Sequence, residues 1–159
     1  MQVDDRGERH ALSLVPAAAA GAGGTMVPAR AAEEIGMTTD IAVGLVNQPG
    51  TLLRASDALG RAGINIDGAC GYVCDGQGVF HVLVEDVQRA RSALIDAGLE
   101  IHAEQRVVAI PVENRPGSAA AILRRIAAAG INVDLLYVTA DSRLVLGGED
   151  LQALRTALG

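Results

Sequence analysis

The sequence predicts an α+β fold of two tandem units with antiparallel sheets, each in the order β-α-β-β-α-β, the second lacking its last strand. An internal repeat is the first reason, because residues 47–67 and 114–134 are identical at 8 of 21 positions, 67 residues apart. Short apolar strands and amphipathic helices also follow one another in the same order around both copies. A hydrophobic content of 50% with only 2% aromatic residues supplies a core of Leu, Ile, Val and Ala.

The first unit, residues 40–105, is divided by turn-forming residues. A Gln-Pro-Gly break separates the first strand from the first helix, and Asp75-Gly76 favours a tight hairpin. Helical spacing places Leu52, Leu53 and Leu59 on the inner face of that helix. The expected elements are a strand at 40–46, a helix at 51–62, strands at 64–74 and 78–84, a helix at 86–98 and a strand at 99–104.

The second unit, residues 106–159, repeats this order as far as its second helix. Its expected elements are a strand at 106–112, a helix at 117–129, strands at 131–138 and 143–147, and a helix through Leu151, Leu154 and Leu158. Without a fourth strand, the second sheet should have an open edge that invites pairing. We expect a neighbouring strand to cover this edge, from the same chain or from another.

Residues 1–39 differ from the rest and are expected to form a disordered Ala/Gly-rich extension. A secretory signal is a weaker interpretation, because Pro16 breaks the apolar stretch and acidic residues precede it. Met26 and Met37 leave open that residues 1–36 lie upstream of the true start.

Charge and cysteine content exclude several classes of partner. The net charge of −6 offers no basic stripe for phosphates, so we expect no nucleic-acid partner. No apolar run approaches the roughly 20 residues of a membrane span, so we expect no membrane association. Cys70 and Cys74 lie on one predicted strand, roughly 13 Å apart, which is too far for a disulfide. We expect free thiols, buried or half-buried, and a cytoplasmic protein.

The repeated ends of the two copies suit a small zwitterionic ligand. Each copy begins with Asn-x-Pro-Gly at a strand-to-helix junction, where free helix amides favour a carboxylate. Each ends with Gly-Ile-Asn, and the side-chain oxygens of both Asn residues accept hydrogen bonds from an ammonium group. The alternative is purely structural: capped turns in which each Asn bonds nearby backbone.

These motifs on a βαββαβ frame resemble the ACT domain, a ferredoxin-like module that senses amino acids. The resemblance covers residues 40–159 as a tandem pair, and it implies a ligand held between ACT units by the first loop and the start of the second strand. Serine-sensing members have a His where this chain has Leu45 and Val112, so an aliphatic amino acid is expected. The implied ligand-binding residues are Asn47, Gln48, Pro49, Gly50, Thr51 and Asn65, and in the second copy Asn114, Arg115, Pro116, Gly117, Ser118 and Asn132.

The predicted function is therefore regulatory binding of a free amino acid by a homodimer that signals to an effector protein. We expect no enzymatic activity, cofactor or metal, because no catalytic constellation is visible. His81 and His102 stand alone on predicted strands as surface or half-buried residues, while Asp67 and Asp134 are predicted to be solvated turn residues. A ligand-free protein–protein interaction module is the alternative. The sequence leaves open which amino acid binds, and whether its sites form within the chain or across the dimer.

Overall fold

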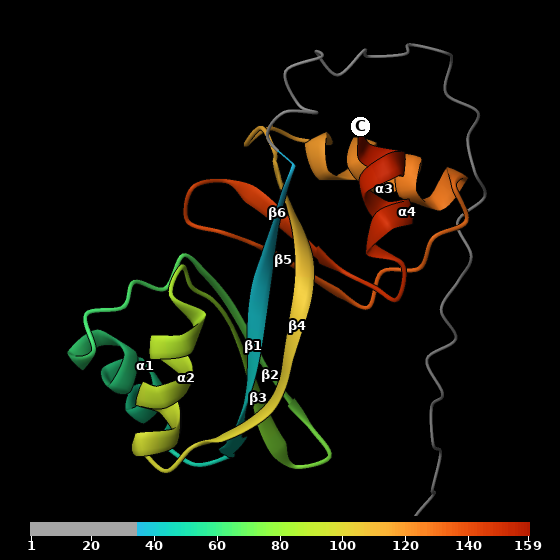
Figure 1. Cartoon of the computed structure of the whole chain (residues 1–159). Coiled ribbons are helices and arrows are strands. Elements are labelled where there is room, and N and C mark those ends of the chain that lie inside the picture. Colours follow the sequence, from blue (N-terminus) through green and yellow to red (C-terminus); the bar gives the residue numbers. More distant parts are fainter. Residues whose placement is uncertain (1–34) are drawn as a thin grey trace, which may run out of the picture.

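The computed structural model describes residues 35–159, which form six strands and four helices (Figure 1). The elements are β1 Gly36–Val46, α1 Thr51–Arg61, β2 Gly68–Cys74, β3 Gln77–Leu83, α2 Val87–Asp96, β4 Glu100–Pro111, α3 Ser118–Ala128, β5 Leu135–Val138, β6 Arg143–Gly147 and α4 Leu151–Leu158. Their order matches the predicted one except that the two strands predicted at 99–104 and 106–112 form one strand, β4. The hairpin between β2 and β3 turns at Asp75-Gly76, where both residues have the positive φ that a two-residue turn requires.

All six strands belong to one antiparallel sheet with the order β2-β3-β1-β4-β6-β5. The sequence predicts two sheets, and they are continuous because β1 and β4 are long enough to serve both halves. β4 combines the strands predicted at 99–104 and 106–112 without a break. We call the part around β2, β3, α1 and α2 the first half, and the part around β5, β6, α3 and α4 the second half.

The strand missing from the second half is supplied by the start of β1. Gly36–Thr39 pair with Ala109–Arg106, whereas the remainder of β1 pairs with β3 and with the start of β4. The open edge predicted for the second half is thus covered by a strand of the same chain. The sequence Gly-Met-Thr-Thr carries no apolar alternation, which is why the strand is predicted only from position 40, whereas β1 begins at Gly36. Residues 1–34 of the predicted extension lie outside the described residues.

Helix pairs cover the two ends of the sheet. α1 and α2 bury Leu59 and Leu94 against the first half, and α3 and α4 bury Ile126 and Leu154 against the second. The prediction that Leu52 and Leu53 face inward is wrong, because they are 50% and 64% exposed. Ala55 and Leu59 form the inner face of α1 instead. Leu53 precedes Ala55 by two residues and therefore lies about 200° around the helix from it.

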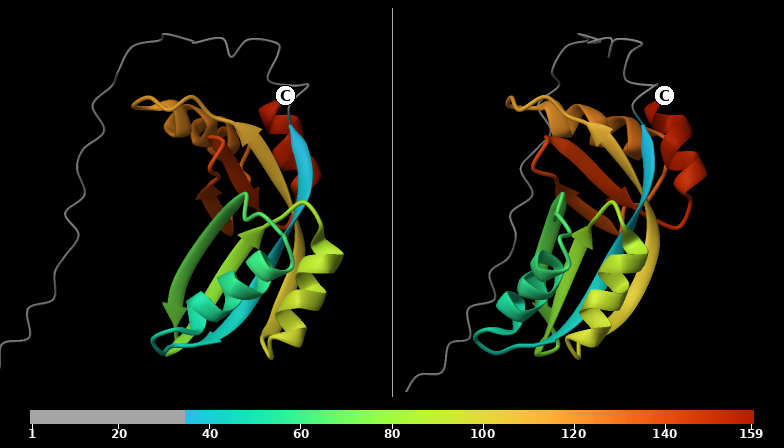
Figure 2. Two further views of the ribbon diagram at one scale, coloured as in Figure 1. Left: turned by 90° about the vertical axis from the view of Figure 1, so that its left-hand side faces the viewer. Right: turned by 60° about the vertical axis from the view of Figure 1, so that its left-hand side comes forward.

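A third cluster of buried residues contains strand residues only: Leu83, Val107, Ala109, Leu135, Tyr137 and Val145. The sheet curls around this cluster, so that its two edge strands approach each other (Figure 2). They meet at a single bridge between Gly68 and Thr139, and Ala140 N donates to Asp67 O at 2.9 Å. A Cβ atom on residue 68 would lie 2.8 Å from the Thr139 side chain, so this approach requires glycine.

Candidate functional site

The two first loops have the same backbone geometry. Gly50 and Gly117 precede α1 and α3 with φ angles of 89° and 88°, and no side chain caps either helix. Thr51 Oγ1 donates within its own loop, to Val46 O at 2.7 Å or Gln48 O at 2.8 Å. Ser118 Oγ, its counterpart, is buried without a partner among residues 35–159. The first amide of each helix donates within its own loop, from Thr51 N to Gln48 O at 3.4 Å and from Ser118 N to Arg115 O at 3.3 Å, and no side chain caps the amides that follow.

The Asn and Pro side chains repeated in these loops are exposed to solvent. Asn47 and Asn114 are exposed, and neither side chain forms a hydrogen bond with another described residue. Gln48, Pro49 and Pro116 are exposed as well, and Arg115 pairs with Glu113. The alternative in which Asn47 and Asn114 cap their own turns has no support from these contacts.

Replacing both Asn47 and Asn114 with alanine is expected to change the free energy of unfolding by less than about 0.5 kcal/mol. Neither side chain is buried or hydrogen-bonded within the described chain, so replacing it with alanine removes no interaction that stabilises the folded state. Urea denaturation followed by circular dichroism measures this difference. The double variant Asn65→Ala with Asn132→Ala is the control and should lose roughly 1 kcal/mol for each side-chain bond. A comparable loss for the loop variant would mean that these Asn residues are turn caps after all.

The second Asn of each copy has a local partner. Asn65 Nδ2 donates to Asp67 Oδ1 at 2.7 Å, and Asn132 Nδ2 donates to Asp134 Oδ1 at 2.7 Å. This identical bond gives a structural reason for the repetition of Asn-x-Asp. It also fixes the orientation of Asp67, which would otherwise be free to rotate.

The structure does not bring Asn65 close to the first loop of its own half. The 11-residue helix α1 separates them, which corresponds to about 16 Å along its axis. Asn65 lies instead beside the turn between β5 and β6 of the second half. Val112 N donates to Ser142 O of that turn at 2.9 Å, so the strand leading into the second loop adjoins it too.

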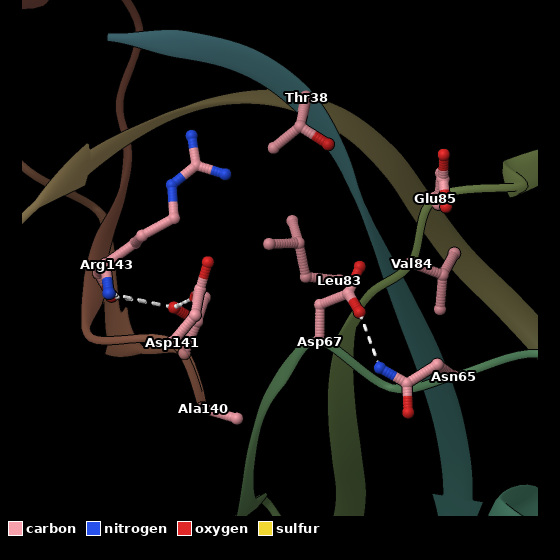
Figure 3. A pocket seen from close by; sticks show the side chains of 10 residues that line it. Thr38, Asn65, Asp67, Leu83, Val84, Glu85, Ala140, Asp141 and Arg143 are labelled. Atoms are coloured by element: carbon pink, nitrogen blue, oxygen red, sulfur yellow. Dashed lines mark hydrogen bonds between the residues drawn. The ribbon is translucent and has the colours of Figure 1, made fainter. Parts of the chain in front are cut away.

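A pocket of about 350 Å³ lies at this junction between the halves (Figure 3). A volume of this size lies at the lower end of the range for small-ligand sites. Its lining residues are Thr38, Asn65, Asp67, Leu83, Val84, Glu85, Thr139, Ala140, Asp141 and Arg143. Of the predicted ligand-binding residues, only Asn65 is among them; Asn132 and both first loops lie elsewhere.

The pocket carries both signs of charge. The Arg143 guanidinium comes from β6, and its Nη2 donates to Ala109 O at 3.4 Å. Asp67 and Glu85 come from the first half and Asp141 from the second. Asp141 accepts a hydrogen bond from Thr139 Oγ1. The Glu85 side chain forms no ion pair or hydrogen bond with another residue of the described part, 35–159. A guanidinium suits a carboxylate, and carboxylates suit an ammonium group.

Beneath the pocket, a buried carboxylate on β1 bonds to side chains on three other strands, β3, β4 and β5. Asp40 on β1 is 0% exposed. Its Oδ2 lies 2.7 Å from His81 Nδ1 on β3 and accepts from Gln105 Nε2 at 3.3 Å, while its Oδ1 accepts from Tyr137 Oη on β5 at 2.8 Å. Sequence reasoning missed this network. His81 was predicted to be at the surface or half-buried, but it is only 7% exposed, because its ring stacks on Tyr72, with ring centroids 5.9 Å apart, and bonds to the buried Asp40.

This environment alters the ionisation of two neighbours of Asp40. Burial, and then the nearby Asp40 carboxylate, raise the pKa of the Tyr137 phenol far above its usual value. The same two causes, in the same order, raise the pKa of the Cys70 thiol. Cys70 is half-buried, as predicted, whereas Cys74 is exposed, and both are free.

Stability is expected to fall above pH of about 10, the ordinary pKa of tyrosine. Because burial raises the pKa of Tyr137, the folded state keeps the phenol proton after the unfolded chain has released it. The contribution of Tyr137 is therefore complete at lower pH, and it is lost at about 1.4 kcal/mol per pH unit as the pH rises. Denaturation curves between pH 8 and 11 (roughly spanning that value) should show a shallower decline for Tyr137→Phe. Tyr72→Phe is the control, since Tyr72 is half-exposed, and an unchanged slope in both variants would contradict this assignment.

Within residues 35–159, no group of three or more His, Cys, Asp or Glu side chains is placed to hold a metal ion. None of the helices in this part of the chain has the length and apolar character needed to cross a membrane. His102 lies on the exposed surface over Gly44.

Comparison with known proteins gives one family and several similar folds. A family model described as an ACT domain pair matches residues 37–157. A protein from Bacteroides thetaiotaomicron is 23% identical, with a TM-score of 0.70 over 78% of this chain and 88% of that chain. The ligand-free regulatory subunit of aspartate kinase from Thermus thermophilus is 21% identical, with a TM-score of 0.58 over 78% and 93%. No curated protein sequence matches. At these identities the solved structures support the fold alone.

Proposed function

Because this chain belongs to the family of ACT domain pairs, we propose that it is a regulatory protein that binds a free amino acid between its two halves. The observation that carries this proposal is the pocket at their junction, where one guanidinium and several carboxylates surround a single cavity. The segment just before β2 contributes Asn65, one of the residues that the resemblance implies, and Asp67, which is not one of them. The turn between β5 and β6 supplies the opposite wall.

Each part of an α-amino acid has a suitable partner in this pocket. The carboxylate pairs with the Arg143 guanidinium, whose planar donors match two oxygens. The ammonium group is attracted by Asp67, which Asn65 holds in place, and by Asp141. Ala140, which is exposed, offers apolar surface to the side chain, whereas Leu83 and Val84 line the pocket but are only 4% and 1% exposed. Since the partners come from both halves, a bound amino acid would link them.

We assign the two first loops to contacts between copies of the chain in a homodimer. Gly50 and Gly117 leave the amides of α1 and α3 free, so a carboxylate from a ligand or a partner would complete them. Val46, Leu52 and Leu53 are exposed apolar residues around the first loop. Burying them against a second copy would remove this apolar surface from water.

A thermal-shift screen of the full chain against each of the twenty amino acids tests the proposed function. A ligand at ~100 times its dissociation constant should stabilise the folded state by about 2.7 kcal/mol. Asn65→Ala should abolish the shift, because it frees Asp67 and removes a lining side chain. Asn132→Ala is a matched control, since it breaks the same Asn–Asp bond outside the pocket. If no amino acid stabilises the wild-type chain, the proposal fails; if both variants bind normally, the ligand lies elsewhere.

A ligand-free assembly module is the second candidate function. It is favoured by exposed apolar residues on both edge strands, Tyr72 and Val73 on β2 and Leu136 and Val138 on β5. Edge strands with such residues readily pair with other strands. Analytical ultracentrifugation of a Val73→Asp, Val138→Asp variant separates the candidates, because an assembly module would lose its association through these edges, whereas the homodimer assigned to the first loops would remain.

A further inference from the structure

The Asp40 network closes the curled sheet. β1 and β5 are not neighbours, because β4 and β6 lie between them in the sheet. The bond from Tyr137 Oη to Asp40 therefore crosses the inside of the curl rather than following the ladder. His81 adds β3 to the same carboxylate. With Gln105 on β4, one side chain thus links four strands: β1 and β4, which both halves share, β3 from the first half and β5 from the second.

The network lies directly below the pocket. Successive side chains on one face of an extended strand are two residues apart. On β1, Thr38 lines the pocket and Asp40 binds the network; on β3 these positions are Leu83 and His81. The segment of β5 and the turn that follows it provides Thr139 and Tyr137 in the same way. The pocket walls and the network are therefore neighbouring layers of the same three segments.

We propose that Asp40 is a positioning residue that sets the spacing of the pocket walls, and so controls ligand affinity without touching the ligand. This inference rests on the proposed function for its ligand-binding part only. The carboxylate holds β5, and with it the turn that carries Asp141 and Arg143, against the start of β2. Apart from the apolar cluster, the contacts between these edges are one bridge and one backbone bond.

The proposal also makes the ligand and the network mutually dependent. A ligand that spans Asp67 and Arg143 favours the closed arrangement in which Tyr137 reaches Asp40. By linkage, loss of the Tyr137 bond must weaken ligand binding by the same factor by which the ligand strengthens the closed arrangement. The edges β2 and β5, which are open to partners, would report this change to an effector protein.

Amide hydrogen exchange of the full chain without ligand tests the positioning role. Tyr137→Phe removes the hydroxyl and keeps the ring in the apolar cluster, and Tyr72→Phe is its matched control at an exposed tyrosine. We expect exchange in β5, in the 139–143 turn and at the start of β2 to become about tenfold to a hundredfold faster, as for the loss of a hydrogen bond to a charged group. Exchange in α1 and α2, which belong to a separate core cluster, should be unchanged.

The outcomes separate this inference from the proposed function. Uniform acceleration throughout the chain, or none, would overturn the positioning role, because the hydroxyl would then contribute only to global stability or to nothing. Titration with each of the twenty amino acids forms the second arm. If hydrogen exchange accelerates only locally and no amino acid binds, the positioning role is supported and the proposed function is contradicted. Equal affinity of wild type and Tyr137→Phe for an amino acid would overturn the control of binding by Asp40.

Discussion

Replacing Arg143 with glutamine is expected to raise the dissociation constant of the amino acid that we propose binds in the pocket by about tenfold to a hundredfold. Arg143 is the only Lys or Arg that lines the described pocket, so its loss leaves the ligand carboxylate without an ionic partner. The remaining carboxylates, Asp67, Glu85 and Asp141, would then repel the ligand carboxylate. Isothermal titration with the amino acid that gives the largest thermal shift measures the change.

Arg124→Gln is the matched control for this experiment, because Arg124 is exposed on α3 and forms no ion pair with residues 35–159. It should bind like the wild type. The bond from Arg143 to Ala109 O is long and only partly buried, so Arg143→Gln should unfold close to the wild type in urea. Unchanged affinity in a folded Arg143→Gln chain would exclude this arginine as the carboxylate partner.

Replacing Asp40 with alanine is expected to reduce the free energy of unfolding by about 3–5 kcal/mol, as found when one partner of a buried pair is removed. The variant leaves the donors of Tyr137 and Gln105, and the ring of His81, without their shared acceptor inside the protein. An unpaired buried polar group keeps its desolvation cost without a compensating bond.

Urea denaturation gives the magnitude, with Asp57→Ala as the control. Asp57 pairs with Arg61 on the exposed face of α1, and such pairs contribute at most about 1 kcal/mol. Asp40→Asn should be less damaging than Asp40→Ala, because an amide oxygen can still accept one hydrogen bond. A loss below about 1 kcal/mol for Asp40→Ala would show that water replaces the carboxylate.

The element order could be predicted because the chain marks its boundaries locally. Gly and Pro end the helices and strands, and Asp75-Gly76 specifies a hairpin turn from two residues. The shared sheet could not be predicted in the same way. Gly36–Thr39 resemble a loop in the sequence, and they become a strand because β4 offers them an unpaired edge.

The candidate site shows the same division. Asn65 was predicted from its repetition, yet the opposite wall of its pocket comes from a turn more than 70 residues later, which no local pattern indicates. His81 and Tyr137 lie 41 and 97 residues from Asp40, so the sequence predicts only a lone histidine on a strand and gives Tyr137 no role. One signal was available: Asp40 directly precedes the run Ile41–Val43, where an acidic residue on a buried strand needs a partner.

The continuity of β1 and β4 makes the two copies of the repeat inseparable. A cut in β4 near residue 105 would divide one strand rather than a linker, and it would leave unpaired backbone in both products. The smallest unit that folds is thus the whole pair, and limited proteolysis has no interdomain hinge at which to release a stable half. A rearrangement that exchanged one copy for another would have to supply both long strands together. The two copies of the repeat therefore form one structural unit built on a single continuous sheet.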